Sequence, residues 1–442
     1  MPIIILIPTV ICIIALCRVS VQRVFLDLFI PIFILFPTYY YWKVAALPPV
    51  DLAESVLFPL GVAICITEIK RWRFDIMDAF IALFIFCCYY ADSENKKSTT
   101  STFEFFFALC HILVPYMAGK LLIEHNGMRV AVVKRIVFCL FIACIISAYE
   151  YRMGQNPFSL LTARYFPGEQ FFWHTSIRWG FGRVSGPYGQ SELAGMVFFF
   201  GLVLALWLSY NHLWEPKFRN AAWLPFKKST VITIVITFTL LMTQARGPWI
   251  GTLAAIPIAF LGRARRVLRA TVLLTVFFLV FGSIGFVVLK AYSSASAVTQ
   301  SSEQENAQYR AQLIDHYWPI AKQGGAWGWG ADFPRADGQV SIDNEYLFVA
   351  LVQGMVGLAA FVAVALGAVY NCAMAAIYNP TKADRSFGFS LLGIEIGLIV
   401  TLFTVFLGTQ SYEIFFLLAG WSQAIRIRPS TLPQLAVEQV YT

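Results

Sequence analysis

Three arginines stand beside glycines or near the start of a helix-forming stretch: Arg183 in GRVSGPYGQ, Arg246 in QARGP and Arg310 in QYRAQ. A guanidinium presents planar, paired donors that match phosphate oxygens, so several arginines at one interface would suit a lipid-linked phosphate or diphosphate. Arg246 interrupts an otherwise apolar stretch, residues 231–261. A charge there is costly unless it is paired or hydrated, although an arginine can also reach toward lipid headgroups. The pattern predicts an anion site with these three arginines as candidates.

A second polar cluster, Asp343, Asn344 and Glu345, precedes an apolar run. Asp343 or Asn344 could cap the helix that follows, by accepting from its first free N–H groups. Alternatively, one of the two carboxylates, Asp343 or Glu345, could be a general base, because a partly apolar interface can raise the proton affinity of a carboxylate. His316 is a further candidate base, although a histidine on an amphipathic helix is more often a surface residue.

Aromatic residues gather around these candidates. They would suit the faces of a carbohydrate, or equally an interfacial aromatic belt. They are Tyr165, Phe171, Phe172, Trp173, Trp179, Trp327 and Trp329, of which Trp329 is an accessory candidate for the site, and His174 lies among them.

No cofactor or metal is expected. The five histidines are scattered along the chain, and no paired aspartates, serine nucleophile elbow or phosphate-cradling loop is present in the sequence. The energy for a reaction would therefore have to arrive with the substrate.

The elements that position these residues are predicted to be membrane helices. Of 442 residues, 58% are hydrophobic and 13% charged, a balance that no soluble domain of this size could hide from water. Apolar runs recur that are long enough, or nearly so, to cross the roughly 30 Å hydrocarbon core as helices. We expect an all-α polytopic integral membrane protein with about 12–13 transmembrane helices. The expected spans are 2–17, 24–42, 53–68, 75–91, 103–123, 136–150, 190–210, 230–244, 248–262, 270–291, 345–370, 388–408 and 412–425.

Most of the 33 Lys and Arg residues fall in one set of alternating loops, which the positive-inside rule assigns to the cytoplasm. This explains the net charge of +8 without a nucleic-acid partner. The expected order is amino-terminal helices (1–150), a periplasmic loop (151–189), central helices (190–291), a large periplasmic loop with site residues (292–344), carboxy-terminal helices (345–425) and a cytoplasmic tail (426–442). The large loop should hold an amphipathic helix at about 303–322, followed by a tight loop at GGAWGWGAD. QARGP should be a tight turn between two short helices, because Gly247 and Pro248 are expected to break the helix after Arg246.

From about residue 180 to 425 the chain resembles the O-antigen ligases and the O-antigen or exopolysaccharide polymerases of bacterial envelopes. The resemblance rests on RVSGPYGQSELAG, TQARGPWIG, GWGAD and DNEYLFVALVQGMVGL. It implies a periplasmic-face enzyme of the inner membrane that holds an undecaprenyl-diphosphate-linked glycan through arginines and transfers the glycan to an acceptor hydroxyl, without metal and with inversion. Arg183, Arg246 and Arg310 would then hold the diphosphate.

The ligases of this family typically have His-Asn where this chain has Asp343 and Asn344. This difference favours a polymerase, with Asp343, or Glu345 as second choice, as the base for the acceptor hydroxyl. A glycan acceptor and a chain-length regulator protein are the expected partners. A ligase that transfers the glycan to lipid A-core is the alternative within the family. The alternative of another class is a lipid-linked oligosaccharide flippase or transporter, although such proteins tend to place the site near the bilayer midplane.

Overall fold

The computed structural model describes residues 2–38, 40–43, 47–95, 98–124, 127–163, 175–218, 225–294, 302–335, 341–379, 381–408 and 410–427. These residues are almost entirely helical. Their strands form two short antiparallel hairpins, β1 (Tyr41–Trp42) with β2 (Val50–Asp51) and β3 (Ile177–Arg178) with β4 (Phe181–Gly182). The all-α prediction is confirmed.

The amino-terminal part contains η1 (Pro2–Leu6), α1 (Ile7–Leu16), α2 (Val21–Val24), η2 (Phe25–Phe29), α3 (Ile30–Leu35), α4 (Glu54–Thr67), η3 (Ile69–Arg71), α5 (Ile76–Glu94), α6 (Ser98–Ala108), η4 (Leu109–Leu113), α7 (Val114–Ala118), η5 (Gly119–Ile123) and α8 (Arg129–Met153). The central part contains α9 (Pro157–Ala163), η6 (Gly186–Tyr188), α10 (Ser191–Tyr210), α11 (Lys228–Met242), α12 (Arg246–Leu261) and α13 (Val267–Ser294). The remainder contains α14 (Ser302–Gln323), η7 (Gly330–Asp332), α15 (Glu345–Val352), α16 (Gly354–Tyr378), α17 (Lys382–Thr401) and α18 (Gln410–Ile427).

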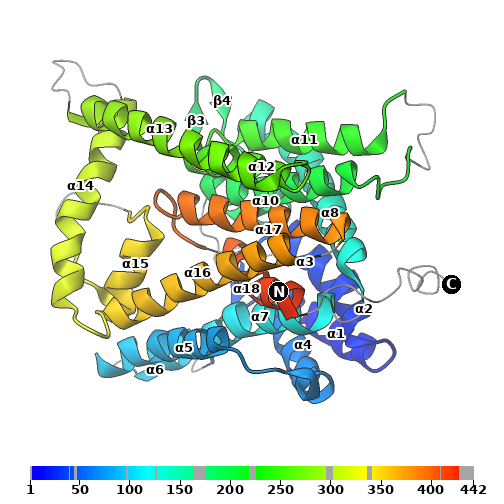
Figure 1. Ribbon diagram of the computed structural model, residues 1–442. Coiled ribbons are helices and arrows are strands. Elements are labelled where there is room, and N and C mark those ends of the chain that lie inside the picture. The colour runs from blue at the N-terminus through cyan, green and yellow to red at the C-terminus, as the bar shows by residue number, and fades with distance from the viewer. Residues whose placement is uncertain are drawn as a thin grey trace.

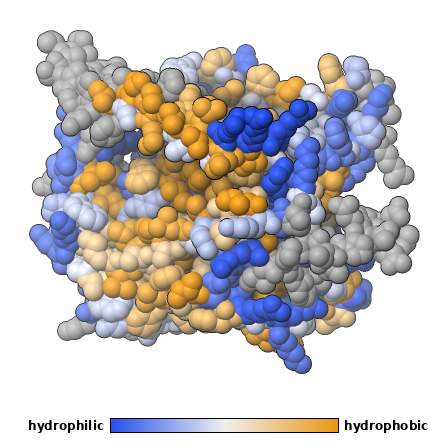
Figure 2. Space-filling view, viewed as in Figure 1, coloured by the Kyte–Doolittle hydropathy of each residue, from blue (hydrophilic) through white to orange (hydrophobic). Residues whose placement is uncertain are grey.

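Six helical segments of the described residues are long and apolar enough to cross a membrane: 76–94, 99–123, 129–153, 191–210, 267–285 and 354–378. Four shorter apolar helices accompany them, at 4–16, 54–67, 228–242 and 246–261. On the face shown in Figure 2, a broad hydrophobic surface covers the middle of the molecule, and hydrophilic residues gather toward its left and right edges. Together these features identify a polytopic membrane protein.

The helices form a bundle whose long axis runs across the page in Figure 1, with α14 standing across its left-hand end between α13 and α15. Helix α10 lies in the core, and its Phe198, Phe199 and Phe200 are all at most 1% exposed. Helices α12 and α17 approach closely because small residues face each other. A Cβ atom at Gly251 would lie only 2.6 Å from the Gly397 carbonyl oxygen. This contact fixes the start of α12, which carries Arg246.

Three predicted spans end differently in the structure. The expected span 24–42 ends as a helix at Leu35, and Tyr41–Trp42 form β1. The expected span 345–370 consists of two helices, because Gly354 adopts a φ of +73°, which interrupts the helix between α15 and α16. The expected span 388–408 ends as a helix at Thr401, and residues 402–408 are non-helical although they are apolar. Helix α14 confirms the amphipathic helix predicted at 303–322.

Candidate functional site

The turn between α11 and α12 consists of residues 243–245, with Gln244 at a φ of +51°. The break therefore precedes Arg246, and our prediction that it would follow Arg246 is wrong. Pro248 is tolerated in the first turn of α12 because the N–H groups of a first turn have no acceptor within their own helix. Arg246 is thus the first residue of α12, where its side chain is exposed.

Residues 177–184 fold over this turn. The Val184 N–H donates to the Met242 carbonyl (3.2 Å), and Arg183 Nε donates to the Thr243 carbonyl (3.3 Å). Arg178 donates to the Gln244 carbonyl (2.8 Å). Arg183 Nη2 also lies 2.6 Å from Glu192 Oε1. The guanidinium of Arg183 is therefore held against the turn that leads into Arg246.

The backbone that follows Arg183 is held by Glu150, at the end of α8. Its Oε2 accepts from the N–H groups of Ser185 (3.0 Å) and Gly186 (2.8 Å), and its Oε1 accepts from the hydroxyls of Ser185 (2.7 Å) and Thr175 (2.9 Å). Glu150 is fully buried. Since Gly186 adopts a φ of +55°, the chain can turn here so that both N–H groups face one carboxylate.

The three polar residues at 343–345 have different surroundings. Asn344 caps α15, since its Oδ1 accepts from the Leu347 N–H (3.1 Å), and its amide donates to the Phe403 carbonyl (3.1 Å). The side chain of Asp343 is 32% exposed and lies 3.9 Å from Arg310. Glu345 is 1% exposed and accepts from the Leu407 N–H (2.7 Å), and burial raises its pKa to about 8. Asp343 is thus the carboxylate that solvent can reach.

Residues 402–408 connect the two halves of the site. The Glu345 N–H donates to the Leu402 carbonyl (3.0 Å). On the other side, Gly247 lies against Thr404, whose Oγ1 would be 2.3 Å from a Cβ atom added at Gly247. This segment therefore lies between the start of α12, with Arg246, and the start of α15, with Glu345.

Helix α14 brings Arg310 to Asp343 by packing on α15. Leu313, Tyr317 and Ala321 lie on one face of α14 and are at most 2% exposed. His316 is on the exposed side of the helix, where a surface histidine is expected. The ion pair of Arg310 is with Asp343, at the α15 side of the 402–408 segment rather than at the turn that Arg183 contacts.

Trp329 joins the ends of two helices. Its backbone N–H donates to the Leu351 carbonyl (2.9 Å) and its indole N–H to the Ile320 carbonyl (2.9 Å). The glycines of GGAWGWGAD allow the backbone of this loop to approach α16 closely, since a Cβ atom at Gly328 would lie 2.4 Å from the Gly354 nitrogen. These contacts give Trp329 a structural role, while the predicted sugar contacts of Tyr165, Phe171, Phe172, Trp173 and His174 lie outside the described residues.

Residues 230–362 match the family model of the O-antigen ligases. The resemblance is confirmed over this segment. No curated protein matches the chain. The match supports a membrane glycosyltransferase of the ligase or polymerase type, and together with the apolar helices it points to a bacterial membrane protein.

The segment that matches the O-antigen ligase family model runs from α11 into α16, so it contains Arg246, Arg310, Asp343 and Glu345. Arg183 lies outside it, and only the fold brings Arg183 to this segment. Sequence reasoning did not single out Arg178, Glu150 or Glu192, or the contribution of residues 402–408. Only the position of Glu150 near the end of an apolar run, where a carboxylate is uncommon, could have drawn attention to it.

Proposed function

We propose that the protein polymerises undecaprenyl-diphosphate-linked oligosaccharide repeat units into O-antigen or exopolysaccharide, at the periplasmic face of the bacterial inner membrane. The observation that carries the proposal is the contact of the Arg183 guanidinium with the turn that leads into Arg246. Two cationic side chains from different segments are thereby held at one end of the bundle, next to the family-matched segment that also carries Arg310 and Asp343.

In this proposal the donor diphosphate binds at the turn between α11 and α12. Arg183 and Arg246 supply guanidinium groups, and the first turn of α12 adds backbone N–H groups and the positive end of the helix dipole. The carbonyl and Glu192 contacts of Arg183 fix the orientation of its planar side chain before the substrate arrives. Arg310 lies with Asp343 on the α15 side of the 402–408 segment rather than at this turn, and in the proposal it binds the diphosphate from that side.

Transfer is a direct displacement that inverts the anomeric carbon, and no metal takes part in it. The acceptor hydroxyl oxygen forms a bond to the anomeric carbon of the donor while the bond from that carbon to the diphosphate oxygen breaks. The hydroxyl proton passes to the Asp343 carboxylate, and the electron pair of the broken bond stays on the diphosphate, whose growing charge the arginines stabilise. The exposed position of Asp343 favours it over Glu345, which is buried and accepts from Leu407.

A ligase that transfers the finished glycan to lipid A-core is the second candidate, supported by the family description of the matched segment. A lipid-linked oligosaccharide flippase is the candidate of another class. Against it stands the position of the arginine and carboxylate groups, which lie at helix starts, in loops and on α14, the helix that stands across one end of the bundle (Figure 1). The glycan donor, the glycan acceptor and a chain-length regulator protein are the proposed partners.

The test uses the purified protein in detergent with the lipid-linked repeat unit of its host. A polymerase lengthens the glycan on the lipid, whereas a transporter forms no glycosidic bond and leaves the length of the glycan unchanged. Arg246→Ala should slow lengthening by about 10²- to 10³-fold if Arg246 is a transition-state donor. Arg178→Lys, next to the same turn, is the matched control that keeps its charge. Full activity of a well-folded Arg246→Ala protein would refute the diphosphate site, and glycan transfer only to lipid A-core would identify a ligase.

A further inference from the structure

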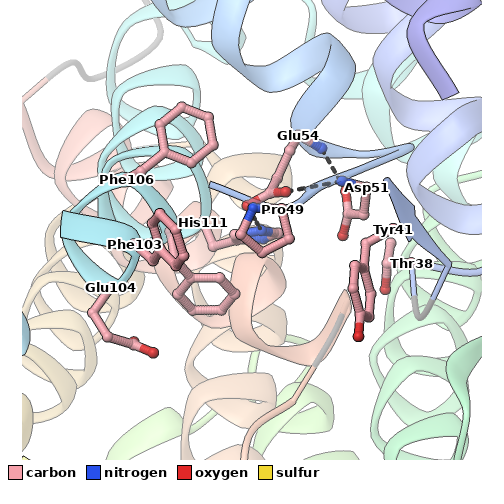
Figure 3. A pocket seen from close by; sticks show the side chains of 10 residues that line it. Thr38, Tyr41, Pro49, Asp51, Glu54, Phe103, Glu104, Phe106 and His111 are labelled. Atoms are coloured by element: carbon pink, nitrogen blue, oxygen red, sulfur yellow. Dashed lines mark hydrogen bonds and ion pairs between the residues drawn. The ribbon is translucent and has the colours of Figure 1, made fainter. Parts of the chain in front are cut away.

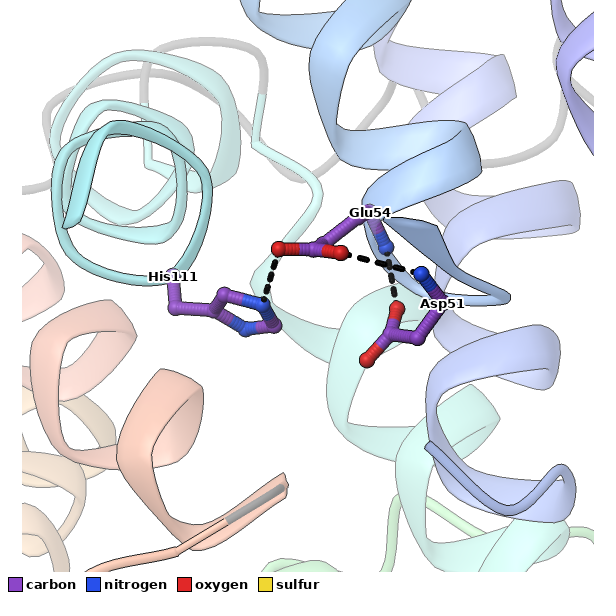
Figure 4. Close-up of side chains that lie close together, drawn as sticks. All are labelled: Asp51, Glu54 and His111. Atoms are coloured by element: carbon purple, nitrogen blue, oxygen red, sulfur yellow. Dashed lines mark hydrogen bonds and ion pairs between the residues drawn. The ribbon is translucent and has the colours of Figure 1, made fainter. Parts of the chain in front are cut away.

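A second cluster of ionisable side chains lies in the amino-terminal half, away from the residues proposed for glycan transfer. Asp51 of β2 and Glu54 at the start of α4 bind each other's backbone: the Glu54 N–H donates to Asp51 Oδ1 (2.7 Å), and the Asp51 N–H donates to Glu54 Oε2 (2.9 Å). His111 of η4 faces them (Figure 4). Glu413 of α18 contacts the other side of the His111 ring.

The two nitrogens of His111 differ in their contacts. Nδ1 lies 2.7 Å from Glu413 Oε1, in hydrogen-bond geometry. Nε2 lies 3.1 Å from Glu54 Oε1, but it has no hydrogen-bond partner, and neither has Glu413 Oε2. The imidazole therefore has one nitrogen fixed by a carboxylate and one nitrogen whose lone pair can face a ligand.

Burial makes this arrangement costly as it stands. Asp51, Glu54, His111 and Glu413 are all at most 7% exposed. Among the described residues, no lysine or arginine forms an ion pair with the three carboxylates. Buried carboxylates require a compensating positive charge, and one imidazolium would balance only one of them.

We propose that Asp51, Glu54 and His111 Nε2 bind a divalent metal ion. Their ligand atoms all lie within 4.8 Å of one another. Ligands bonded to one ion at about 2.1 Å are separated by about 3 Å, which fits the 3.1 Å between Nε2 and Glu54 Oε1. A donor set of one imidazole and two carboxylates suits Zn²⁺ or Mn²⁺ better than Ca²⁺, which prefers oxygen ligands alone.

Glu413 has the position of the carboxylate that commonly supports a metal-bound histidine. Such a carboxylate accepts from the nitrogen that does not face the metal, and thereby fixes the tautomer and the ring orientation. The 2.7 Å contact at Nδ1 provides this bond. The ion and its supporting carboxylate would join three parts of the chain that are far apart in the sequence: β2 with the start of α4, η4, and α18.

A cavity of about 270 Å³ leads to the cluster (Figure 3). Asp51, Glu54 and His111 line it together with Glu104 and aromatic side chains that include Tyr41 and Phe103. It provides an entry path and room for water on the remaining coordination positions. Glycan transfer does not depend on this ion in our proposal, so the metal site and the proposed function can fail independently.

The experiment is metal binding to the purified full-length protein, treated with a chelator, returned to buffer and titrated with Mn²⁺. The decrease of the electron paramagnetic resonance signal of free Mn²⁺ should show that the protein binds one equivalent tightly. Pulsed measurements on the bound Mn²⁺ should detect coupling to one imidazole nitrogen, which requires no variant and so does not depend on whether a variant folds.

Variants then assign the ligands. His111→Gln should abolish tight binding, and Glu413→Gln should weaken it by about 10- to 100-fold, because the ring loses its supporting carboxylate. Glu104 lines the same cavity but does not belong to the cluster, so Glu104→Gln should bind Mn²⁺ like wild type. Absence of nitrogen coupling, or equal binding by His111→Gln, would overturn the proposal and leave an imidazolium held between Glu54 and Glu413.

Discussion

Replacing Glu150 by alanine should release the backbone that carries Arg183. Two buried N–H groups, those of Ser185 and Gly186, would lose their acceptor. An unsatisfied buried donor costs about 1–3 kcal/mol, so the free energy of unfolding should fall by about 2–6 kcal/mol. The two hydroxyls that also donate to Glu150 can rotate toward other acceptors, and they add little to this loss.

Glu150→Gln is the matched control. Its amide oxygen can take the place of Oε2 and keep both backbone N–H bonds, while its NH₂ group donates to the two hydroxyl oxygens after they rotate. Only the additional strength of a charged acceptor is lost, so the change should be about 1–2 kcal/mol.

The assay is unfolding in mixed micelles with increasing SDS, together with glycan lengthening at several donor concentrations. Glu150→Ala should unfold earlier and require more donor, because Arg183 is no longer held against the α11–α12 turn. If Glu150→Gln loses as much stability as Glu150→Ala, the reasoning from hydrogen-bond geometry is wrong. If Glu150→Ala behaves as wild type in both assays, Glu150 does not position Arg183.

Three further predictions follow from the site and its supports. Arg310→Ala breaks an exposed ion pair worth less than about 1 kcal/mol, so the unfolding midpoint should stay within error while glycan lengthening falls; an equal loss of both would contradict a binding role. Burial raises the pKa of Glu345 in the folded protein, so the contribution of Glu345 to stability is full below the pKa of the unfolded chain and is lost as pH rises through about 8. Melting temperatures measured as pH rises through about 8 should decline in wild type and decline less in Glu345→Gln. Gly328→Ala should destabilise the protein more than Gly325→Ala, because both glycines have positive φ but a Cβ atom at Gly328 also meets Gly354, whereas Gly325 faces open space; equal thermal shifts would refute the close contact.

The sequence alone determined the class of the protein and the types of group at the site. Apolar runs separated by basic loops determine a helical membrane protein, because each run must satisfy its own backbone inside lipid. The helical spacing of Leu313, Ile314, Tyr317, Trp318 and Ala321 predicted α14. The motifs around Arg246 and Asp343 indicated the resemblance to O-antigen ligases, which the match of residues 230–362 to that family model supports.

Only the tertiary structure decided which residues meet. The apolar segment 402–408 reads as part of a span, yet its backbone groups accept from Glu345 and donate to it, so it leaves the helix. Glu150 holds the backbone next to Arg183, and Arg183 contacts the α11–α12 turn, through hydrogen bonds between segments far apart in the chain. His111 looked isolated because its neighbours Asp51, Glu54 and Glu413 come from three other elements. Local composition encodes burial and helix formation, whereas partners for buried charges are chosen by long-range packing, which no single stretch of sequence contains.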